Sequence, residues 1–159
     1  QQGLVLVFPV RDNLTLASLH RVSRGGVLQP PQEEALAQEM VASMAIKTPS
    51  LSVTTNTLSG GNQQKVVIGN WLNTLPDVLI MDEPTRGIDI QAKEQIFTLV
   101  RDLARQGLAV LFVSSEIEEV LDVSDRILIL NQGRITGEVT HDEITLEQLM
   151  ALAMEELVP

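Results

Sequence analysis

The stretch VLIMDEPTRGID, from Val78 to Asp89, decides the fold of this chain. Its first four residues, Val78–Met81, form an unbroken apolar run, which is typical of a strand buried on both faces. Two carboxylates, Asp82 and Glu83, follow, and Pro84 prevents the strand from continuing. Ligands of open α/β sheets bind at the carboxyl ends of strands. Asp82 is therefore placed to hold a hydrated Mg²⁺, and Glu83 to orient or deprotonate an attacking water. An ordinary strand exit with solvated acids is the alternative.

The residues after this stretch predict a helix and then a second strand. Ile96, Leu99, Val100 and Leu103 recur at helical spacing, and Gly107 lies where a helix commonly ends. Leu108–Val113 is another apolar run of strand length. The order strand, helix, strand predicts a βαβ unit, and therefore a parallel sheet.

A second motif, LSGGNQQK, occupies Leu58 to Lys65. Ser59 is placed to cap a helix that begins with Gly60 and Gly61 and ends before Pro76. Glycines let a phosphate approach the backbone N–H groups, and a helix N-terminus carries partial positive charge. The motif therefore predicts a phosphate-binding turn, and the alternative is a plain capped helix start.

The remaining segments give weaker predictions. Leu4–Val10 predicts a short strand or an extended lead-in, and Asn13 predicts a helix N-cap. Further predictions are a turn at Ser23–Gln32, helices at Pro31–Met44, Glu116–Leu121 and Thr145–Leu157, and a hairpin of Ile127–Leu130 with Ile135–Val139. The pair Glu118–Glu119 predicts a solvated helix face, and His20 and His141 predict plain surface positions.

Composition excludes several classes of function. The chain has 159 residues, 44% of them hydrophobic, which is sufficient for one domain with a core. Its formal net charge of -10 opposes binding to nucleic acid or to anionic lipid. The aromatic content of 3% leaves few side chains on which nucleic-acid bases could stack. There is no Cys, so disulfides and thiolate sites are excluded. No apolar run is long enough to cross a bilayer.

Taken together, LSGG, the following apolar helix and strand, DEPT and Asp89 closely resemble the nucleotide-binding domain of ATP-binding cassette (ABC) transporters. With VSSE at Val113–Glu116, the chain looks like the C-terminal cassette of the tandem-cassette subunit of ribose/galactose/xylose-type importers. The resemblance implies an α/β fold, specifically a P-loop NTPase-like cassette fragment. Residues 1–57 would be the segment after the Q-loop and the helical subdomain. Residues 58–159 would form the back half of the parallel-sheet core, from the signature helix to the C-terminal hairpin and helix.

The same resemblance assigns roles to individual residues. The signature would comprise Leu58, Ser59, Gly60, Gly61 and Asn62, in which Asn62 replaces the more usual Gln. Asp82 would be the Walker B carboxylate that binds Mg²⁺, Glu83 the catalytic glutamate, and Asp89 the acidic residue of the D-loop. Ser115 stands where the family has its switch histidine. A hydroxyl does not do what an imidazole does for a γ-phosphate, so we expect this cassette's own Walker B site to be impaired.

No G-x-x-x-x-G-K-[ST] phosphate loop occurs in the chain. The resemblance places that loop before Gln1, and implies that Ser59–Gly61 read the γ-phosphate of ATP held by a second cassette. It also implies membrane permease subunits as partners, an indirect link to a periplasmic sugar-binding protein, and a peripheral location on the cytoplasmic face of the inner membrane. The alternatives are an inactive remnant of such a subunit and a soluble ABC ATPase that is not tied to transport.

Overall fold

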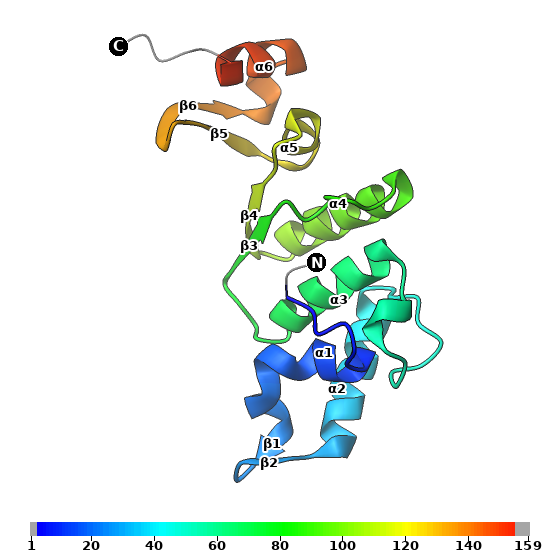
Figure 1. The fold of residues 1–159 in the computed structure, drawn as a ribbon. Coiled ribbons are helices and arrows are strands. Elements are labelled where there is room, and N and C mark those ends of the chain that lie inside the picture. The colour runs from blue at the N-terminus through cyan, green and yellow to red at the C-terminus, as the bar shows by residue number, and fades with distance from the viewer. Residues whose placement is uncertain (1–2, 155–159) are drawn as a thin grey trace. The chain divides into compact units, whose positions relative to one another are not determined.

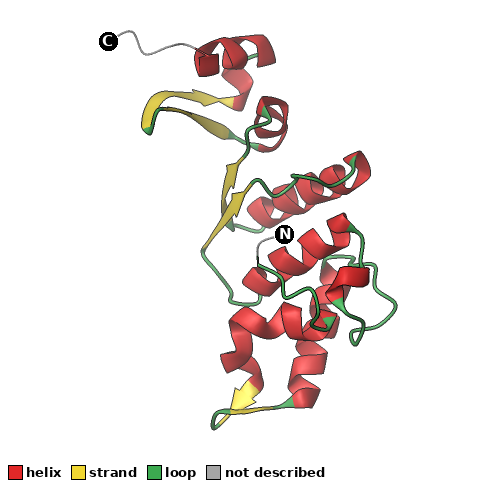
Figure 2. Ribbon diagram, in the orientation of Figure 1, coloured by secondary structure: helices red, strands yellow, loops and turns green. Residues whose placement is uncertain are grey.

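A computed structural model describes residues 3–154 of the chain, which folds as two compact units (Figures 1 and 2). The first unit comprises Gln1–Leu79 and Thr85–Val110, and the second comprises Ile80–Pro84 and Leu111–Pro159. The α-helices are α1 (Val10–Thr15), α2 (Pro30–Ser43), α3 (Gly60–Leu72), α4 (Ile90–Arg105), α5 (Ile117–Val123) and α6 (Leu146–Met154). The strands are β1 (Ser23–Arg24), β2 (Val27–Leu28), β3 (Val78–Asp82), β4 (Ala109–Val113), β5 (Arg126–Asn131) and β6 (Arg134–Thr140). Short 3₁₀ helices are η1 (Leu16–Val22), η2 (Thr55–Thr57) and η3 (His141–Glu143).

Helices dominate the first unit. Helix α1 packs against α2 and α3, and α3 packs against α4. The core of this unit includes Val10 and Leu14 of α1, Val66 of α3 and Ile96 of α4, none of which is exposed. The predicted helices after Pro31 and after Gly61 are confirmed, although α2 already begins at Pro30.

The N-terminal segment contains no strand among its described residues. Its extended part ends at an isolated bridge between Pro9 and Thr54, and α1 begins at Val10. The predicted turn at Ser23–Gln32 forms a small antiparallel hairpin of β1 and β2. Its two central residues, Gly25 and Gly26, have φ of 59° and 80°, which glycine adopts without strain.

The prediction that Asn13 caps a helix is wrong. Pro9 occupies the N-cap position of α1, and Asn13 lies inside the helix with 1% of its surface exposed. Its side chain joins two distant segments, because Oδ1 accepts a bond from Val5 N at 2.9 Å and Nδ2 donates to Thr55 Oγ1 at 2.8 Å. Nδ2 also lies 3.0 Å from Val5 O. Asn13 thus satisfies backbone groups that no helix or strand would satisfy.

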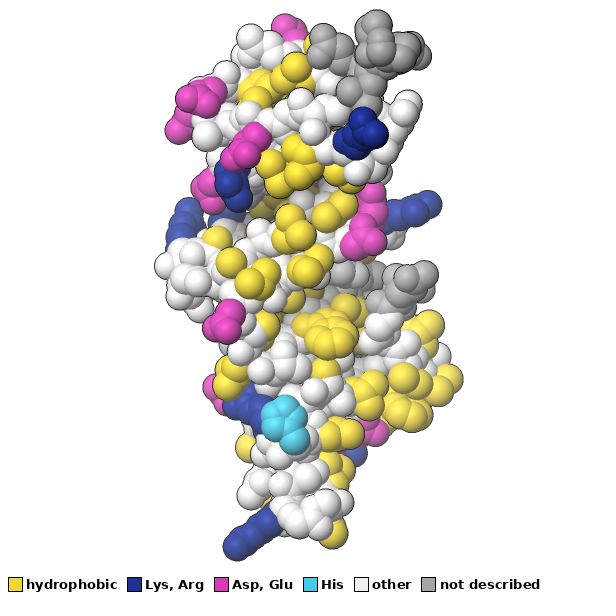
Figure 3. All heavy atoms as spheres, turned by 90° about the vertical axis from the view of Figure 1, so that its left-hand side faces the viewer, with side chains coloured by type: hydrophobic (Ala, Val, Ile, Leu, Met, Phe, Trp, Pro, Cys, Tyr) yellow, Lys and Arg dark blue, Asp and Glu magenta, His cyan; other side chains and the backbone are white. Residues whose placement is uncertain are grey.

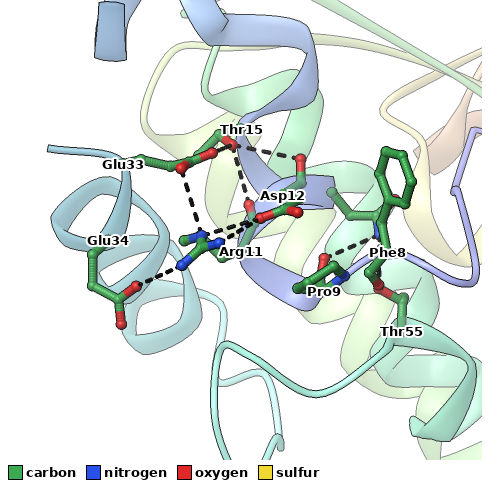
Figure 4. Close-up of polar contacts among 9 residues, drawn as sticks. Phe8, Pro9, Arg11, Asp12, Thr15, Glu33, Glu34 and Thr55 are labelled. Carbon is green, nitrogen blue, oxygen red and sulfur yellow. Dashed lines mark hydrogen bonds and ion pairs between the residues drawn. The ribbon is translucent and has the colours of Figure 1, made fainter. Parts of the chain in front are cut away.

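An ion cluster ties α1 to α2 (Figure 4). The Arg11 guanidinium lies 3.0 Å from Asp12 Oδ1, and 3.5 Å from Glu33 Oε2 and from Glu34 Oε2. The Glu33 side chain is only 5% exposed, and its Oε1 also accepts a bond from Thr15 Oγ1 at 2.9 Å. The buried carboxylate is therefore both paired and hydrogen-bonded, as burial of a charge requires.

Strands β3 and β4 form the predicted pair. Ala109 N donates to Asp77 O near the start of both strands, and Glu83 N donates to Val113 O past their ends, so the pair is parallel. Burial on both faces, however, is not observed. Leu79 and Met81 are buried, whereas Val78 is 55% and Ile80 67% exposed. Figure 3 shows hydrophobic side chains, coloured yellow, at several places on the surface that it presents.

The second unit contains the predicted hairpin. Strands β5 and β6 pair antiparallel around Gln132 and Gly133, both of which have positive φ. Ile127, Ile129 and Leu149 form a buried cluster between the hairpin and α6. The predicted last helix is confirmed to Met154, and Leu157 lies outside the described residues. Among residues 3–154 no helix is long and apolar enough to cross a membrane.

We predict that Asn13→Ala lowers the free energy of unfolding by about 2–4 kcal/mol, because it removes a buried amide that bonds Val5 N, Val5 O and Thr55 Oγ1 and leaves Val5 N without this partner. Urea unfolding of the chain measures the change. Asn56→Ala is the matched control, because the exposed Asn56 amide accepts a single side-chain bond, from Thr54 Oγ1. Equal effects of the two substitutions would contradict the role assigned to Asn13.

Candidate functional site

The start of α3 carries the LSGG motif, and the structure places it against the turn before α4. A Cβ built on Gly60 would lie 3.4 Å from Ile88 Cγ2, which is ordinary contact, but a Cβ on Gly61 would lie 2.5 Å from Ala92 Cβ. Position 61 therefore requires glycine for close packing of the two helices. Leu58 is buried beneath this corner, and Ser59 is exposed at its rim.

Asn62 makes two contacts that the sequence did not predict. Its Nδ2 donates to Ser59 Oγ at 2.8 Å, and its Oδ1 accepts a bond from Lys47 N, also at 2.8 Å. Asn62 thus connects Ser59 to the loop after α2. The spacing of Ser59 and Asn62, one helical turn apart, was the only signal in the sequence for the first of these contacts.

Asp89 lies at the N-cap of α4 and not at the end of a free loop. Its Oδ1 accepts a bond from Ala92 N at 2.9 Å, and its backbone has the extended conformation typical of that position. The side chain also places negative charge at the positive end of the helix. Asp89 therefore stabilises the start of α4, in addition to the D-loop role that the resemblance implies.

Two buried polar side chains follow in α3. Gln63 Nε2 donates to Leu58 O at 3.0 Å, which fixes the residue that precedes Ser59. Lys65 is 6% exposed, and its Nζ donates to Ala45 O at 3.3 Å. Burial, with a smaller contribution from the charge of Lys47, lowers the pKa of the Lys65 ammonium from its ordinary value.

Asp82, Glu83 and Ser115 belong to the second unit. Asp82 is exposed at the end of β3, and Glu83 adopts a positive φ of 47° just after it. Ser115 donates its backbone N–H to Glu83 Oε1 at 2.8 Å. The structure therefore brings the candidate catalytic carboxylate to Ser115, which the resemblance places at the switch position, but the contact is made by the backbone of Ser115.

The segment after β4 is fixed by Ser114, which the sequence did not single out. Ser114 Oγ donates to Glu119 Oε2 at 2.9 Å and accepts a bond from Glu116 N at 3.0 Å. Glu119 is 5% exposed, so the prediction of a solvated Glu118–Glu119 face is wrong for this residue. His20 and His141 are exposed, as predicted, and the ring of His141 is hydrogen-bonded to Leu121 O.

The donors at the end of β3 fit Mg²⁺ only in company with a nucleotide. No group of three or more His, Asp or Glu side chains within residues 3–154 could hold a metal ion. Mg²⁺ in phosphate-transfer sites is bound by one or two carboxylates together with waters and phosphate oxygens. An exposed Asp82 suits that arrangement, whereas it would not make a metal site by itself.

Comparison with known proteins gives consistent results. The family model described as "ABC transporter" matches residues 7–86, half of the chain. Over 96% of its length the chain is 45% identical to the ribose import ATP-binding protein RbsA of Oceanobacillus iheyensis, of which it covers 31%. Over 99% of its length it is 42% identical to the xylose import ATP-binding protein XylG of Photobacterium profundum, again covering 31%. The chain thus spans about a third of the length of these relatives.

Solved structures agree with the fold. A dimeric post-hydrolysis state of the ATP-binding cassette MJ0796, bound to ADP and Pi, superposes with a TM-score of 0.72 and 26% identity. The alignment covers 89% of this chain and 61% of that cassette. The α/β cassette-fragment fold that was expected from the sequence is therefore confirmed.

We predict that Gly61→Ala lowers the free energy of unfolding by about 1–3 kcal/mol, because the added methyl group overlaps Ala92 and forces α3 and α4 apart. Gly60→Ala is the matched control, because its methyl group meets Ile88 at ordinary contact distance. In the control the free energy of unfolding should stay the same or rise slightly, since alanine favours helix more than glycine does. Urea unfolding of both variants checks this, and a neutral Gly61→Ala would contradict the packing argument.

Proposed function

Because the chain belongs to the ABC transporter family, we propose that it is part of the ATP-binding, energy-coupling component of a monosaccharide import system. Support comes from relatives named as ribose and xylose import ATP-binding proteins, at 45% and 42% identity. The proposal concerns the whole subunit, because this chain spans only 31% of either relative.

The start of α3, where Ser59 is exposed and Gly60 is half-buried, carries the proposal. Ser59, Gly60 and Gly61 offer a hydroxyl and backbone amide groups at the N-terminus of a 13-residue helix, where an anion is favoured. The chain nevertheless contains no lysine-bearing phosphate loop. We infer that this end of α3 reads the γ-phosphate of ATP bound by a second cassette, so that two cassettes complete one site.

The second group of residues would serve the cassette's own nucleotide. Asp82 would hold Mg²⁺, which neutralises phosphate charge when it is bound. Glu83 would face the attacking water, with its carboxylate held by the Ser115 N–H. Because Ser115 has no imidazole to donate to a γ-phosphate, we infer that this site hydrolyses ATP less efficiently than the site completed by Ser59.

The remaining partners follow from an import function. The component would act at the cytoplasmic face of the inner membrane as a peripheral subunit that contacts membrane permeases. A periplasmic sugar-binding protein would contribute indirectly, and nucleic acid is not expected as a partner because the net charge is -10. Hydrolysis of ATP would drive the permeases between their inward- and outward-open states.

We predict that the 159-residue chain by itself neither hydrolyses ATP nor binds it with micromolar affinity. The physical reason is that no segment of it supplies the phosphate-loop amides and lysine that hold the β- and γ-phosphates. Titration calorimetry and phosphate release measure the two properties, with a complete cassette as positive control. Turnover by the purified chain would contradict the proposed division of the site.

In a full-length subunit that carries this segment, we predict that Ser59→Arg abolishes transport whereas Glu83→Gln reduces it less. An arginine side chain would fill the space beside the helix amides in the efficient site. Loss of the Glu83 carboxylate would affect only the impaired one. Uptake of radiolabelled sugar into vesicles measures both.

Asn56→Ala again serves as the control for this comparison, because it removes an exposed amide that forms no hydrogen bond with Ser59 or with Glu83. It should leave uptake unchanged. The reverse order of severity for Ser59→Arg and Glu83→Gln would mean that the efficient site is the one built on Glu83.

A further inference from the structure

Ser59 is the N-cap residue of α3 by position but not by bonding. Its backbone is extended, with φ of -63° and ψ of 156°, and the helix begins at the next residue. A serine at this position normally accepts a hydrogen bond from the backbone N–H two or three residues later. The Ser59 side chain makes no such capping bond. Its Oγ instead accepts a bond from the side chain of Asn62 at 2.8 Å.

The orientation of the Asn62 amide is determined by its other contact. Lys47 N is a donor, so the atom of Asn62 that lies 2.8 Å from it must be the oxygen. The nitrogen then faces Ser59, and Ser59 Oγ must be the acceptor. A hydroxyl that accepts in this direction keeps its own proton for another partner.

The loop that supplies Lys47 N is itself held by α3. Lys65 Nζ donates to Ala45 O at 3.3 Å. Ile46, which lies between Ala45 and Lys47 in the sequence, is 5% exposed. Ile46 N also donates to Val41 O at 3.0 Å. The donor that orients Asn62 is therefore fixed by burial and by two hydrogen bonds, and does not depend on a free loop.

We propose that Asn62 is a positioning residue for phosphate recognition: it holds the Ser59 hydroxyl away from the first amide groups of α3 and leaves the hydroxyl proton free for the γ-phosphate. This inference rests on the proposed function of Ser59. Without Asn62 the hydroxyl would rotate onto the helix amides, as a serine N-cap ordinarily does. The helix would then be capped, and the amide group from which the hydroxyl accepts would be lost to the phosphate.

The test is a double-mutant cycle of Ser59→Ala, Asn62→Ala and the double variant in a full-length subunit. Steady-state ATP hydrolysis gives kcat/KM, and thermal unfolding gives the midpoint of each variant. We expect Asn62→Ala to lower kcat/KM by roughly tenfold, which is the factor for one lost hydrogen bond to a charged group. The unfolding midpoint should change little, because the helix gains a cap while the exposed Lys47 N loses its bond to Asn62.

Coupling between the two positions separates positioning from a merely structural role. If Asn62 acts through Ser59, the double variant has the same kcat/KM as Ser59→Ala. Multiplied losses in the double variant would overturn the inference. If Ser59→Ala keeps the wild-type kcat/KM, the proposed function of Ser59 is overturned. That result needs only the single variant and not the double-mutant cycle.

A second substitution reverses the polarity of the contact. In Asn62→Asp one carboxylate oxygen still accepts from Lys47 N, and the other turns Ser59 into the donor, so the hydroxyl proton points inward. We expect a larger loss of kcat/KM than for Asn62→Ala. Gln64→Glu introduces the same charge two residues later. We expect its kcat/KM to fall by only a small part of the loss in Asn62→Asp. Similar losses for the two acidic variants would show that charge alone matters, and would count against positioning by Asn62.

Discussion

The contact between Gly61 in α3 and Ala92 in α4 is the constraint on which the candidate phosphate-reading end depends. The two helices come so close that a Cβ on Gly61 would lie 2.5 Å from that of Ala92. This approach fixes the start of α3 beside the turn that carries Asp89, whose side chain caps α4 through Ala92 N. Ser59 is exposed at the edge of this corner, yet its position is fixed. Leu58 before it is hydrogen-bonded to Gln63, and Gly61 after it packs against Ala92.

Helix α3 and Asn73, which caps its C-terminus, bind neighbouring segments of the first unit through polar side chains. Asn70 Oδ1 accepts a bond from Ala17 N, and Asn73 Nδ2 donates to Leu14 O, both at 2.8 Å. Lys65 does the same for Ala45 O. Loops and 3₁₀ turns contain backbone groups that no helix or strand satisfies, so a helix packed against them needs buried donors and acceptors. This explains why the face of α3 that packs against these segments is rich in amides.

Regular elements could be predicted from the sequence because local signals mark them. Pro84 and Gly107 delimit β3 and α4, and the Gly61 region begins α3. The roles of Asn13 and Glu119 could not be predicted, because their partners are determined by tertiary structure. The exposure of Val78 and Ile80 was also missed, since an apolar run indicates a strand but not what covers each face. For the candidate site, the motif indicated candidate residues, whereas their hydrogen bonds are seen only in the structure.

A serine hydroxyl at a helix N-terminus can accept a hydrogen bond from the helix amides or from another donor, and only the second choice leaves those amides for a ligand. Capping would stabilise α3 by about 1 kcal/mol and would occupy the amide groups that an anion requires. The side-chain amide of Asn62 decides this competition locally, because it offers the hydroxyl another partner without adding charge. If Ser59 reads a phosphate as proposed, the residue after the two glycines contributes to recognition for a physical reason: its amide determines from which donor the Ser59 hydroxyl accepts.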